Sequence, residues 1–205
     1  KAWRTCVDPR AINLKIRDST YPLPLAKDIF DKLAGNEVFS VIDLASGFNQ
    51  FRVVVADRKK TAFTWNGKVY QFVGAPFGFK NIPQDFQRIM DRMFSDLPCV
   101  IVYIDDIVVA SSSFRKHIID IKNVITHMNA TNLRINIQKL KLGFIEIVVI
   151  GNLVSKDGVT VAVEKLAKMD NWDLEQEQGY PITLKQLQHR LGFLNFFREY
   201  IPMYS

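Results

Sequence analysis

Two adjacent aspartates, Asp105 and Asp106, interrupt the otherwise apolar stretch CVIVYIDDIVVAS (residues 99–111). The β-branched residues on both sides predict two buried strands joined by a turn. Ionised carboxylates beside a core are costly unless a cation neutralises them. A third acid, Asp43, ends the predicted strand EVFSVIDL (37–44). Three carboxylates at one sheet edge would hold hard divalent cations such as Mg²⁺, and two such ions suit in-line phosphoryl transfer.

The aspartate pair also has a purely structural interpretation, because aspartate is common in turns. Three features favour the metal interpretation: the tight apolar frame around the pair, Tyr103 just before it, and Asp43 at the end of another strand. The residues alone leave both interpretations open.

The elements that must position these acids follow from the spacing of apolar residues. Spacings of three and four predict three helices, over residues 25–34, 82–97 and 114–130. Apolar and β-branched runs predict four strands, over residues 37–44, 99–104, 107–111 and 132–137. Strand, helix, strand, strand, helix, strand is the split pattern of ferredoxin-like folds. That topology places the first strand beside the hairpin, so the acids meet at one edge.

The remaining segments are less regular. We expect extended segments over residues 48–55 and 59–65, followed by an Asn-Gly hairpin turn in WNGK (65–68). A further hairpin is expected over residues 143–161, turning at KDG (156–158). Helices over residues 163–172 and 183–199, joined by a polar loop at 173–181, form a separate C-terminal piece.

Composition excludes some functions and permits others. A chain of 205 residues with 48% hydrophobic residues is long enough to bury a real core. The net charge of +6 suggests a polyanionic partner, although a solvated basic surface explains it as well. Two cysteines and three histidines form no ligand-like pairs, so we expect no zinc site. No apolar stretch reaches the ~20 residues that span a bilayer. The chain lacks an initial Met and a signal peptide, and we expect it to be cut from a longer protein.

Several motifs, in order along nearly the whole chain, resemble those of reverse transcriptases. YIDD (103–106) resembles the Tyr-X-Asp-Asp box, and FSVIDLASGFNQFRV (39–53) resembles the first catalytic motif in its gypsy-type LTR retrotransposon form. Three further resemblances are APFGFKNIPQDFQRIMD (75–91), WRTCVDPRAIN (3–13) and the thumb-like LGFLNFFREYIPMYS (191–205). The departures, such as KLKL at 139–142, do not alter the three acids themselves.

The resemblance implies an α+β right-hand polymerase with a ferredoxin-like palm, partial fingers and a helical thumb. The fingers would span residues 1–17 and 53–76 and would be truncated at the N-terminus. The palm would span residues 18–52 and 77–162, and the thumb would span residues 163–205. It implies an RNA-directed DNA polymerase that uses two Mg²⁺ ions, or Mn²⁺, and adds deoxynucleotides to a primer 3′-hydroxyl. The implied partners are an RNA or DNA template with primer, deoxynucleoside triphosphates, and ribonuclease H and other Pol domains. We expect no membrane partner, and the implied location is an intracellular, cytoplasmic virus-like particle.

Site residues carry over by motif match. Asp43, Asp105 and Asp106 would be catalytic, with the metals on Asp43, Asp105 and the Leu44 carbonyl, and Asp106 a weaker ligand. The resemblance assigns nucleotide binding to Arg4, Phe48 as steric gate, Phe77 and Gly78. It assigns the primer to Tyr103, Ile150 and Gly151, and the duplex to Gln188, His189, Gly192 and Phe196.

Each of these assignments has a plainer alternative. Phe48 and Ile150 would also serve as core residues, Gly78 as a loop glycine and Arg4 as a surface residue. The face of the last helix would also suit ordinary packing. For the whole chain, the alternatives are a catalytically incomplete fragment that binds primer–template, or a decayed copy. An RNA-copying RNA polymerase is disfavoured by Phe48, because ribonucleotides need room at that position.

Overall fold

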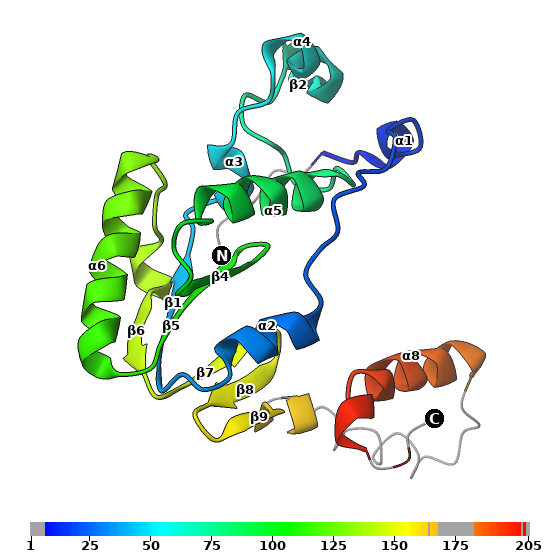
Figure 1. Cartoon of the computed structure of the whole chain (residues 1–205). Helices are drawn as coiled ribbons and strands as arrows, with labels where there is room; N and C mark the ends of the chain where they lie inside the picture. Colours follow the sequence, from blue (N-terminus) through cyan, green and yellow to red (C-terminus); the bar gives the residue numbers. More distant parts are fainter. Residues whose placement is uncertain (1–6, 164, 168–182, 202, 204–205) are drawn as a thin grey trace. The chain divides into compact units, whose positions relative to one another are not determined.

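The computed structural model describes residues 7–163, 165–167, 183–201 and 203 (Figure 1). The chain divides into two compact units. The first comprises residues 1–147 and 154–158, and the second comprises residues 148–153 and 159–205. The residues of the expected site are divided between these two units.

A four-stranded antiparallel sheet organises the first unit. Its strands are β1 (Val38–Asp43), β4 (Val100–Tyr103), β5 (Asp106–Ser111) and β6 (Lys141–Phe144). The order β4-β5-β1-β6 puts the first strand between the hairpin and the last strand, as the ferredoxin-like pattern requires. The ferredoxin-like α+β sheet topology expected from the sequence is therefore confirmed.

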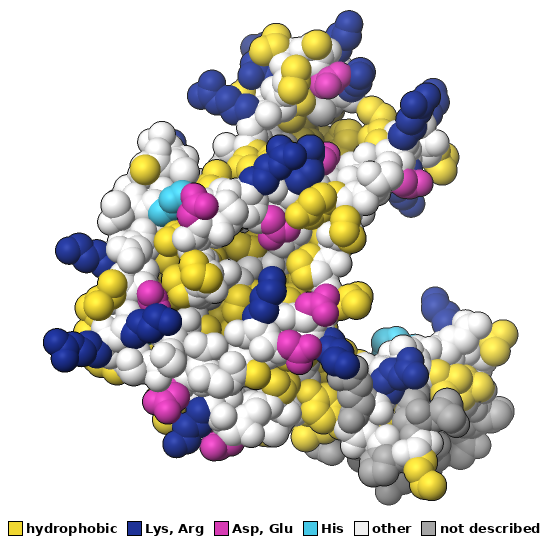
Figure 2. Space-filling view, viewed as in Figure 1, with side chains coloured by type: hydrophobic (Ala, Val, Ile, Leu, Met, Phe, Trp, Pro, Cys, Tyr) yellow, Lys and Arg dark blue, Asp and Glu magenta, His cyan; other side chains and the backbone are white. Residues whose placement is uncertain are grey.

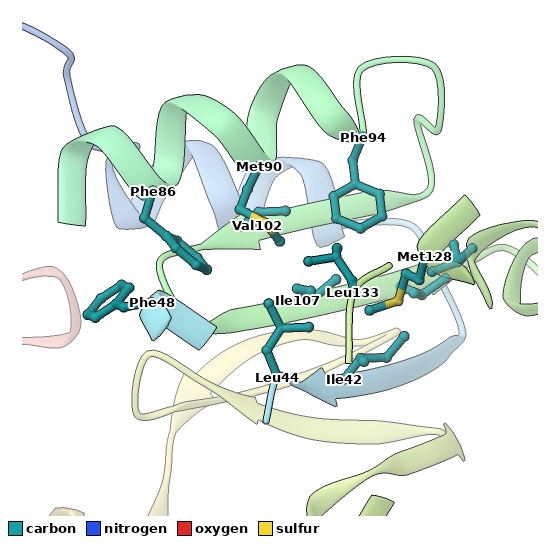
Figure 3. Close-up of a cluster of buried hydrophobic side chains, with 12 residues drawn as sticks. Ile42, Leu44, Phe48, Phe86, Met90, Phe94, Val102, Ile107, Met128 and Leu133 are labelled. Atoms are coloured by element: carbon teal, nitrogen blue, oxygen red, sulfur yellow. The ribbon is translucent and has the colours of Figure 1, made fainter. Parts of the chain in front are cut away.

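Three helices accompany this sheet: α2 (Ala26–Leu33), α5 (Ile82–Met93) and α6 (Phe114–Ala130). Figure 3 shows Phe86, Met90 and Phe94, along and just after α5, pointing toward the strands. The helix ends at Met93 rather than at the predicted residue 97. Pro98 explains the difference, because proline cannot donate a helical hydrogen bond and its ring would clash with the Phe94 carbonyl.

The segment between β1 and α5 differs from prediction. It forms short helical turns where extended chain was expected: α3 (Gly47–Gln50), α4 (Val55–Arg58) and η1 (Lys59–Thr61). The turn of α3 is what buries Phe48, which is 7% exposed. The hairpin of β2 (Phe63–Trp65) and β3 (Lys68–Tyr70) has the predicted Asn-Gly turn, with φ of 47° at Asn66 and 71° at Gly67. At the N-terminus, α1 spans Arg10–Asn13.

The strand predicted over residues 132–137 is wrong. This segment makes one isolated bridge, Leu44 to Ile135, and then enters η2 (Ile137–Lys139). Its backbone instead bonds to the loop after β1, where the Ala45 amide donates to the Arg134 carbonyl and the Asn136 amide to the Asp43 carbonyl. The fourth strand of the sheet therefore comes later, as β6.

A second sheet, in the order β7-β8-β9, follows β6. Its strands are β7 (Glu146–Val149), β8 (Asn152–Ser155) and β9 (Gly158–Val161), so the predicted hairpin has an additional turn at residues 150–151. In the second unit, Val163 and residues 165–167 are helical, and the rest of the helix predicted to 172 and the loop at 173–181 lie outside the described residues. The last helix, α8 (Leu184–Asn195), begins with a Thr183–Gln186 capping box and precedes η3 (Arg198–Tyr200). Within the described ranges, no helix combines the length and apolarity needed to cross a membrane.

Candidate active site

The three acids lie at one end of the first sheet. Asp43, the last residue of β1, is directly opposite Asp106 in the register of β1 and β5. Asp106 also pairs with Tyr103 across the β4–β5 hairpin, whose loop is Ile104 and Asp105 alone. The expectation that both Asp105 and Asp106 occupy the turn is thus corrected, because Asp106 begins β5. A two-residue loop leaves no room for a third residue in the turn.

This hairpin turn is held in a strained conformation by a buried glutamine. Ile104 has φ of 52°, in the left-handed region that β-branched residues rarely adopt. Its amide donates to Oε1 of Gln87 at 2.7 Å, and Nε2 of Gln87 donates to the Val102 carbonyl at 2.9 Å. Gln87 is fully buried on α5 and connects the helix to β4 and to the first residue of the turn. Its role was not predicted from the sequence, although a glutamine beside Phe86 on an apolar helix face is a usable signal.

A cavity of about 640 Å³ opens at the turn. Asp43, Leu44 and Asp105 are among its lining residues, and this part of the lining is here called the acidic floor. Other lining residues, not identified from the sequence as functional, include Lys139, Asn136, Asn49 and Phe72. Lys139 follows the segment that bonds to the end of β1, so its position depends on contacts that no local pattern reveals. The cavity is polar and large enough for a sizeable polar ligand.

Burial and like charge make this floor electrostatically unfavourable. Desolvation raises the pKa of Asp105 above its ordinary value, with further increases from the charges of Asp106 and Asp43. The Oδ1 atom of Asp105 is buried without a hydrogen-bond partner. Desolvation and the charge of Asp43 also raise the pKa of Asp106, but that residue is exposed, so Asp105 carries the argument. A cation placed here would relieve both costs.

A cationic side chain already meets the floor. Nζ of Lys139 lies 3.1 Å from Oδ2 of Asp43, and its charge lowers the pKa of Asp105 against the raising effects. Its side chain is 65% exposed, so the ion pair is weakly held. This arrangement shows that the floor accepts positive charge.

The donor set fits a divalent cation that a substrate completes, rather than a closed metal cage. In the part of the chain that the structure describes, no three acidic, histidine or cysteine side chains are placed to hold a metal together. The expected three-acid cluster is therefore reduced to two cavity-lining carboxylates, Asp43 and Asp105, beside Leu44. Mg²⁺ is commonly held by one or two carboxylates, with water and substrate phosphates as the remaining ligands. A Cβ on Gly47 would lie 3.2 Å from Oδ1 of Asp105, so glycine leaves that oxygen space.

The residues predicted to bind the nucleotide lie in different surroundings. Phe77 is 39% exposed and lines the cavity. Phe48 is a core residue in contact with Phe77, with ring centroids 5.1 Å apart, and is not among the cavity-lining residues. Gly78 has φ of 94° and faces Pro9, where a Cβ would approach to 2.9 Å. Arg4 lies outside the described residues.

The predicted primer and duplex residues are split between the two units. Tyr103 ends β4 in the first unit, beside the acids. Ile150 and Gly151 form the β7–β8 turn in the second unit, with φ of 50° and 74°. On α8, Gln188, His189 and Gly192 are exposed, and Phe196 at its end has the Lys165 ammonium 2.9 Å from its ring centroid. Their roles remain predictions.

Comparison with known proteins identifies the chain's relatives. Residues 1–178 match the family of reverse transcriptases (RNA-dependent DNA polymerases). The chain belongs to this family. It is 32% identical to the retrovirus-related Pol polyprotein from transposon opus of Drosophila melanogaster, over 100% of this chain and 20% of that protein. It is 29% identical to the Tf2-3 transposon polyprotein of Schizosaccharomyces pombe, over 98% of this chain and 15% of that one.

Solved structures give the same result. A foamy viral protease–reverse transcriptase bound to double-stranded DNA superposes with a TM-score of 0.87 at 28% identity, over 99% of this chain and 35% of that chain. The corresponding complex with an RNA/DNA hybrid gives a TM-score of 0.81 at 28% identity, over 96% of this chain and 26% of that chain. The resemblance to a retrotransposon reverse transcriptase domain is therefore confirmed. The chain spans about a fifth or less of the retrotransposon polyproteins cited here.

Proposed function

We propose that this chain is the core of an RNA-directed DNA polymerase, in which Asp43 and Asp105 hold the catalytic cations. In the reaction, the primer 3′-oxygen forms a bond to the α-phosphorus of a deoxynucleoside triphosphate, and the bond to pyrophosphate breaks. The observation that carries the proposal is that Asp43, Leu44 and Asp105 line one cavity in a chain of the reverse transcriptase family.

The proposed residue roles follow from position. Asp43 and Asp105, with the Leu44 carbonyl, would hold Mg²⁺, while Asp106 shapes the local charge from outside the cavity. When bound, the cations would lower the pKa of the primer hydroxyl and neutralise charge on the phosphates. The burial of Asp105 keeps water from screening its charge.

The cavity wall suggests how the nucleotide is positioned. Phe77, which lines the cavity, would pack against the sugar or base. Phe48 stays the candidate for excluding a ribose 2′-hydroxyl, and it contacts Phe77 directly. Arg4 would bind the triphosphate, because its planar guanidinium suits phosphate.

The proposed partners extend beyond the cavity. In the first unit, Tyr103 would contact the primer. In the second unit, taken by itself, Ile150 and Gly151 would contact the primer and the exposed face of α8 the duplex. A Cβ on Gly192 would meet no atom within 4 Å, so this part of α8 leaves its backbone open to a ligand. Ribonuclease H and other Pol domains, and a cytoplasmic virus-like particle as the location, complete the proposal on family resemblance.

Primer extension tests the proposal. On a poly(rA)·oligo(dT) hybrid with Mg²⁺, the wild-type chain should extend the primer with deoxythymidine triphosphate. Asp43→Asn and Asp105→Asn should each reduce the rate by at least about 100-fold, the order of loss that misplaced reacting groups cause. The exposed Asp157, in the β8–β9 turn, is the matched control, and Asp157→Asn should extend normally.

The same assay separates the alternative function, a fragment that binds primer–template without turnover. That alternative requires duplex binding by all variants and no extension by the wild type. Extension that survives unchanged in Asp43→Asn and Asp105→Asn would contradict the assigned roles.

A further inference from the structure

We propose that the β2–β3 hairpin is a stacking surface for unpaired nucleic acid that adjoins the acidic cavity and extends beyond it. Its aromatic members, here called the hairpin platform, are Phe63, Trp65, Tyr70 and Phe72. The unpaired nucleic acid would be the template strand that the proposed polymerase copies. The biological meaning of the platform therefore rests on the proposed function, although the binding test below does not.

The register of the hairpin places these rings on one face. Phe63 pairs with Tyr70, and Trp65 pairs with Lys68. Side chains alternate between the faces of a strand, so both pairs share a face, and the pair Thr64–Val69 lies on the other. Phe72 follows Tyr70 by two residues and contacts Phe63, with ring centroids 5.5 Å apart.

The platform is open to solvent. Trp65 is 61% exposed and Tyr70 is 44% exposed. The four rings line a hollow of about 250 Å³. The Phe63–Tyr70 pair, with ring centroids 5.7 Å apart, stabilises the hairpin as a cross-strand aromatic pair. Trp65 lies opposite Lys68 at the tip of the hairpin. No cross-strand aromatic pair therefore accounts for an aromatic residue at position 65.

The surrounding charge indicates a polyanion. Residues 55–72 contain four basic residues and one acid, Asp57. Asp57 forms an ion pair with Lys60 at 2.6 Å, while Lys59 and Lys68 are exposed. Figure 2 shows Lys and Arg side chains around hydrophobic ones over α4 and this hairpin. Exposed rings among cations are what single-stranded nucleic acid binds, through stacking of its bases and contacts with its phosphates.

The platform is connected to the cavity through one residue. Phe72 lines both the hollow and the acidic cavity. Its backbone is fixed at the base of the hairpin, because its amide donates to Oγ1 of Thr61 at 2.9 Å, and Thr61 donates to the Arg58 carbonyl at 2.7 Å. Nearby, a Cβ on Gly74 would lie 2.2 Å from the Asn49 carbonyl oxygen, so the chain after the hairpin and α3 are in close contact. A strand unpaired next to the cavity therefore has a continuous path onto the rings. In a duplex the base faces are stacked inside the helix, so they cannot stack on these rings and duplex binding gains nothing from the platform.

Fluorescence anisotropy with the full chain tests this inference. The probes are a labelled 20-nucleotide single-stranded RNA of mixed sequence and a blunt-ended duplex of the same sequence. Trp65→Ala should weaken single-strand binding by roughly 5- to 150-fold, the range for loss of one stacked base. Duplex binding should change less than about twofold. Val69→Ala, on the opposite face of the hairpin and 74% exposed, is the matched control and should bind both probes normally.

The salt dependence provides a second measurement. The double variant Lys59→Ala, Lys68→Ala should reduce the slope of log K against log salt for the single strand by about 0.7 for each phosphate that the two lysines neutralise. An unchanged slope, an equal loss for both probes in Trp65→Ala, or no loss for either would overturn the proposal. A Trp65→Ala loss confined to the single strand would support it even if the wild type fails to extend primers, which would contradict only the proposed polymerase. Single-strand binding that persists in Asp105→Asn would separate the two sites further.

Discussion

Two hairpins of the first unit have two-residue turns of opposite character. The β2–β3 turn is Asn66–Gly67, two residue types that adopt positive φ readily, and it lies exposed among lysines and aromatic rings. The β4–β5 turn is Ile104–Asp105, in which isoleucine has a φ of 52°. Local sequence explains the first turn. The second forms because distant residues hold it, which is expected where geometry serves chemistry rather than stability.

The supporting contacts differ accordingly. Behind the acidic turn, Phe86 is 3% exposed and packs edge-to-face against Phe48 and Phe51. At the hairpin platform, Trp65 is 61% exposed. The chain thus places carboxylates on a packed core, where small displacements matter, and stacking rings on an open hairpin, where bases of any sequence can be accommodated.

The largest expected effect is on the free energy of unfolding, and it is tested by replacing one aromatic residue in each region. Phe86→Ala should lower the free energy of unfolding by about 3–5 kcal/mol, because it leaves a cavity in the core. Trp65→Ala should change it by less than about 0.5 kcal/mol, because the ring is exposed. Urea unfolding of both variants measures the difference. Similar losses would mean that the hairpin platform is a structural core of its own.

A smaller effect is expected at the glutamine that holds the acidic turn. Gln87→Met keeps the volume but leaves the Ile104 amide and the Val102 carbonyl without their partner, at a cost of roughly 1–3 kcal/mol for each buried group. Primer extension should fall by about 100-fold, because Asp105 loses its placement. Exposed Gln71, beside the platform, is the control, and Gln71→Met should match the wild type in urea unfolding and extension. Normal extension by Gln87→Met would show that the turn keeps its geometry unaided.

The smallest effect concerns pH and the buried His117 on α6. Nδ1 of His117 lies 2.9 Å from Oγ of Ser111, which donates to Asp120 at 2.7 Å, and Nε2 lies 2.7 Å from Oγ of Ser40. Because the Ser111 hydroxyl donates its proton to Asp120, it must accept from His117, so Nδ1 donates to Ser111 and Nε2 accepts from Ser40. A neutral imidazole satisfies this chain of hydrogen bonds, which ties α6 to β1 and β5.

Burial lowers the pKa of His117 below its ordinary value of 6.5, and the charge of Asp120 opposes this only in part. The unfolded chain therefore binds the proton more readily, and stability is lost as pH falls from about 6.5 through the lower folded-state pKa. Thermal unfolding between pH 7.5 and 5.5 should show this loss in the wild type and in His189→Gln, whose histidine is exposed. His117→Gln should flatten it, and the same slope in that variant would assign the titration elsewhere.

The comparison also shows how far sequence reasoning reaches. The bounds of α6, the Asn66–Gly67 turn and the meeting of Asp43 with the acidic hairpin were predictable, because each depends on a local pattern or on strand topology. The roles of Lys139 and Phe72 were not, because they arise from contacts far apart in the sequence. The place of Gln87 on an apolar helix face signals burial, but its partners Ile104 and Val102 could not be predicted from it. The false strand at 132–137 has the same cause: its partner is a loop, and only the folded chain reveals it.

The most direct test of the central claim is a Mn²⁺ titration, followed by electron paramagnetic resonance of the free ion, with primer–template present. We expect the wild-type chain and Asp157→Asn to bind Mn²⁺, and Asp43→Asn and Asp105→Asn to lose at least one bound ion. This result would establish that two carboxylates distant in the sequence share a cation at the β4–β5 turn. Equal Mn²⁺ binding by the wild type and both cavity variants would contradict the account.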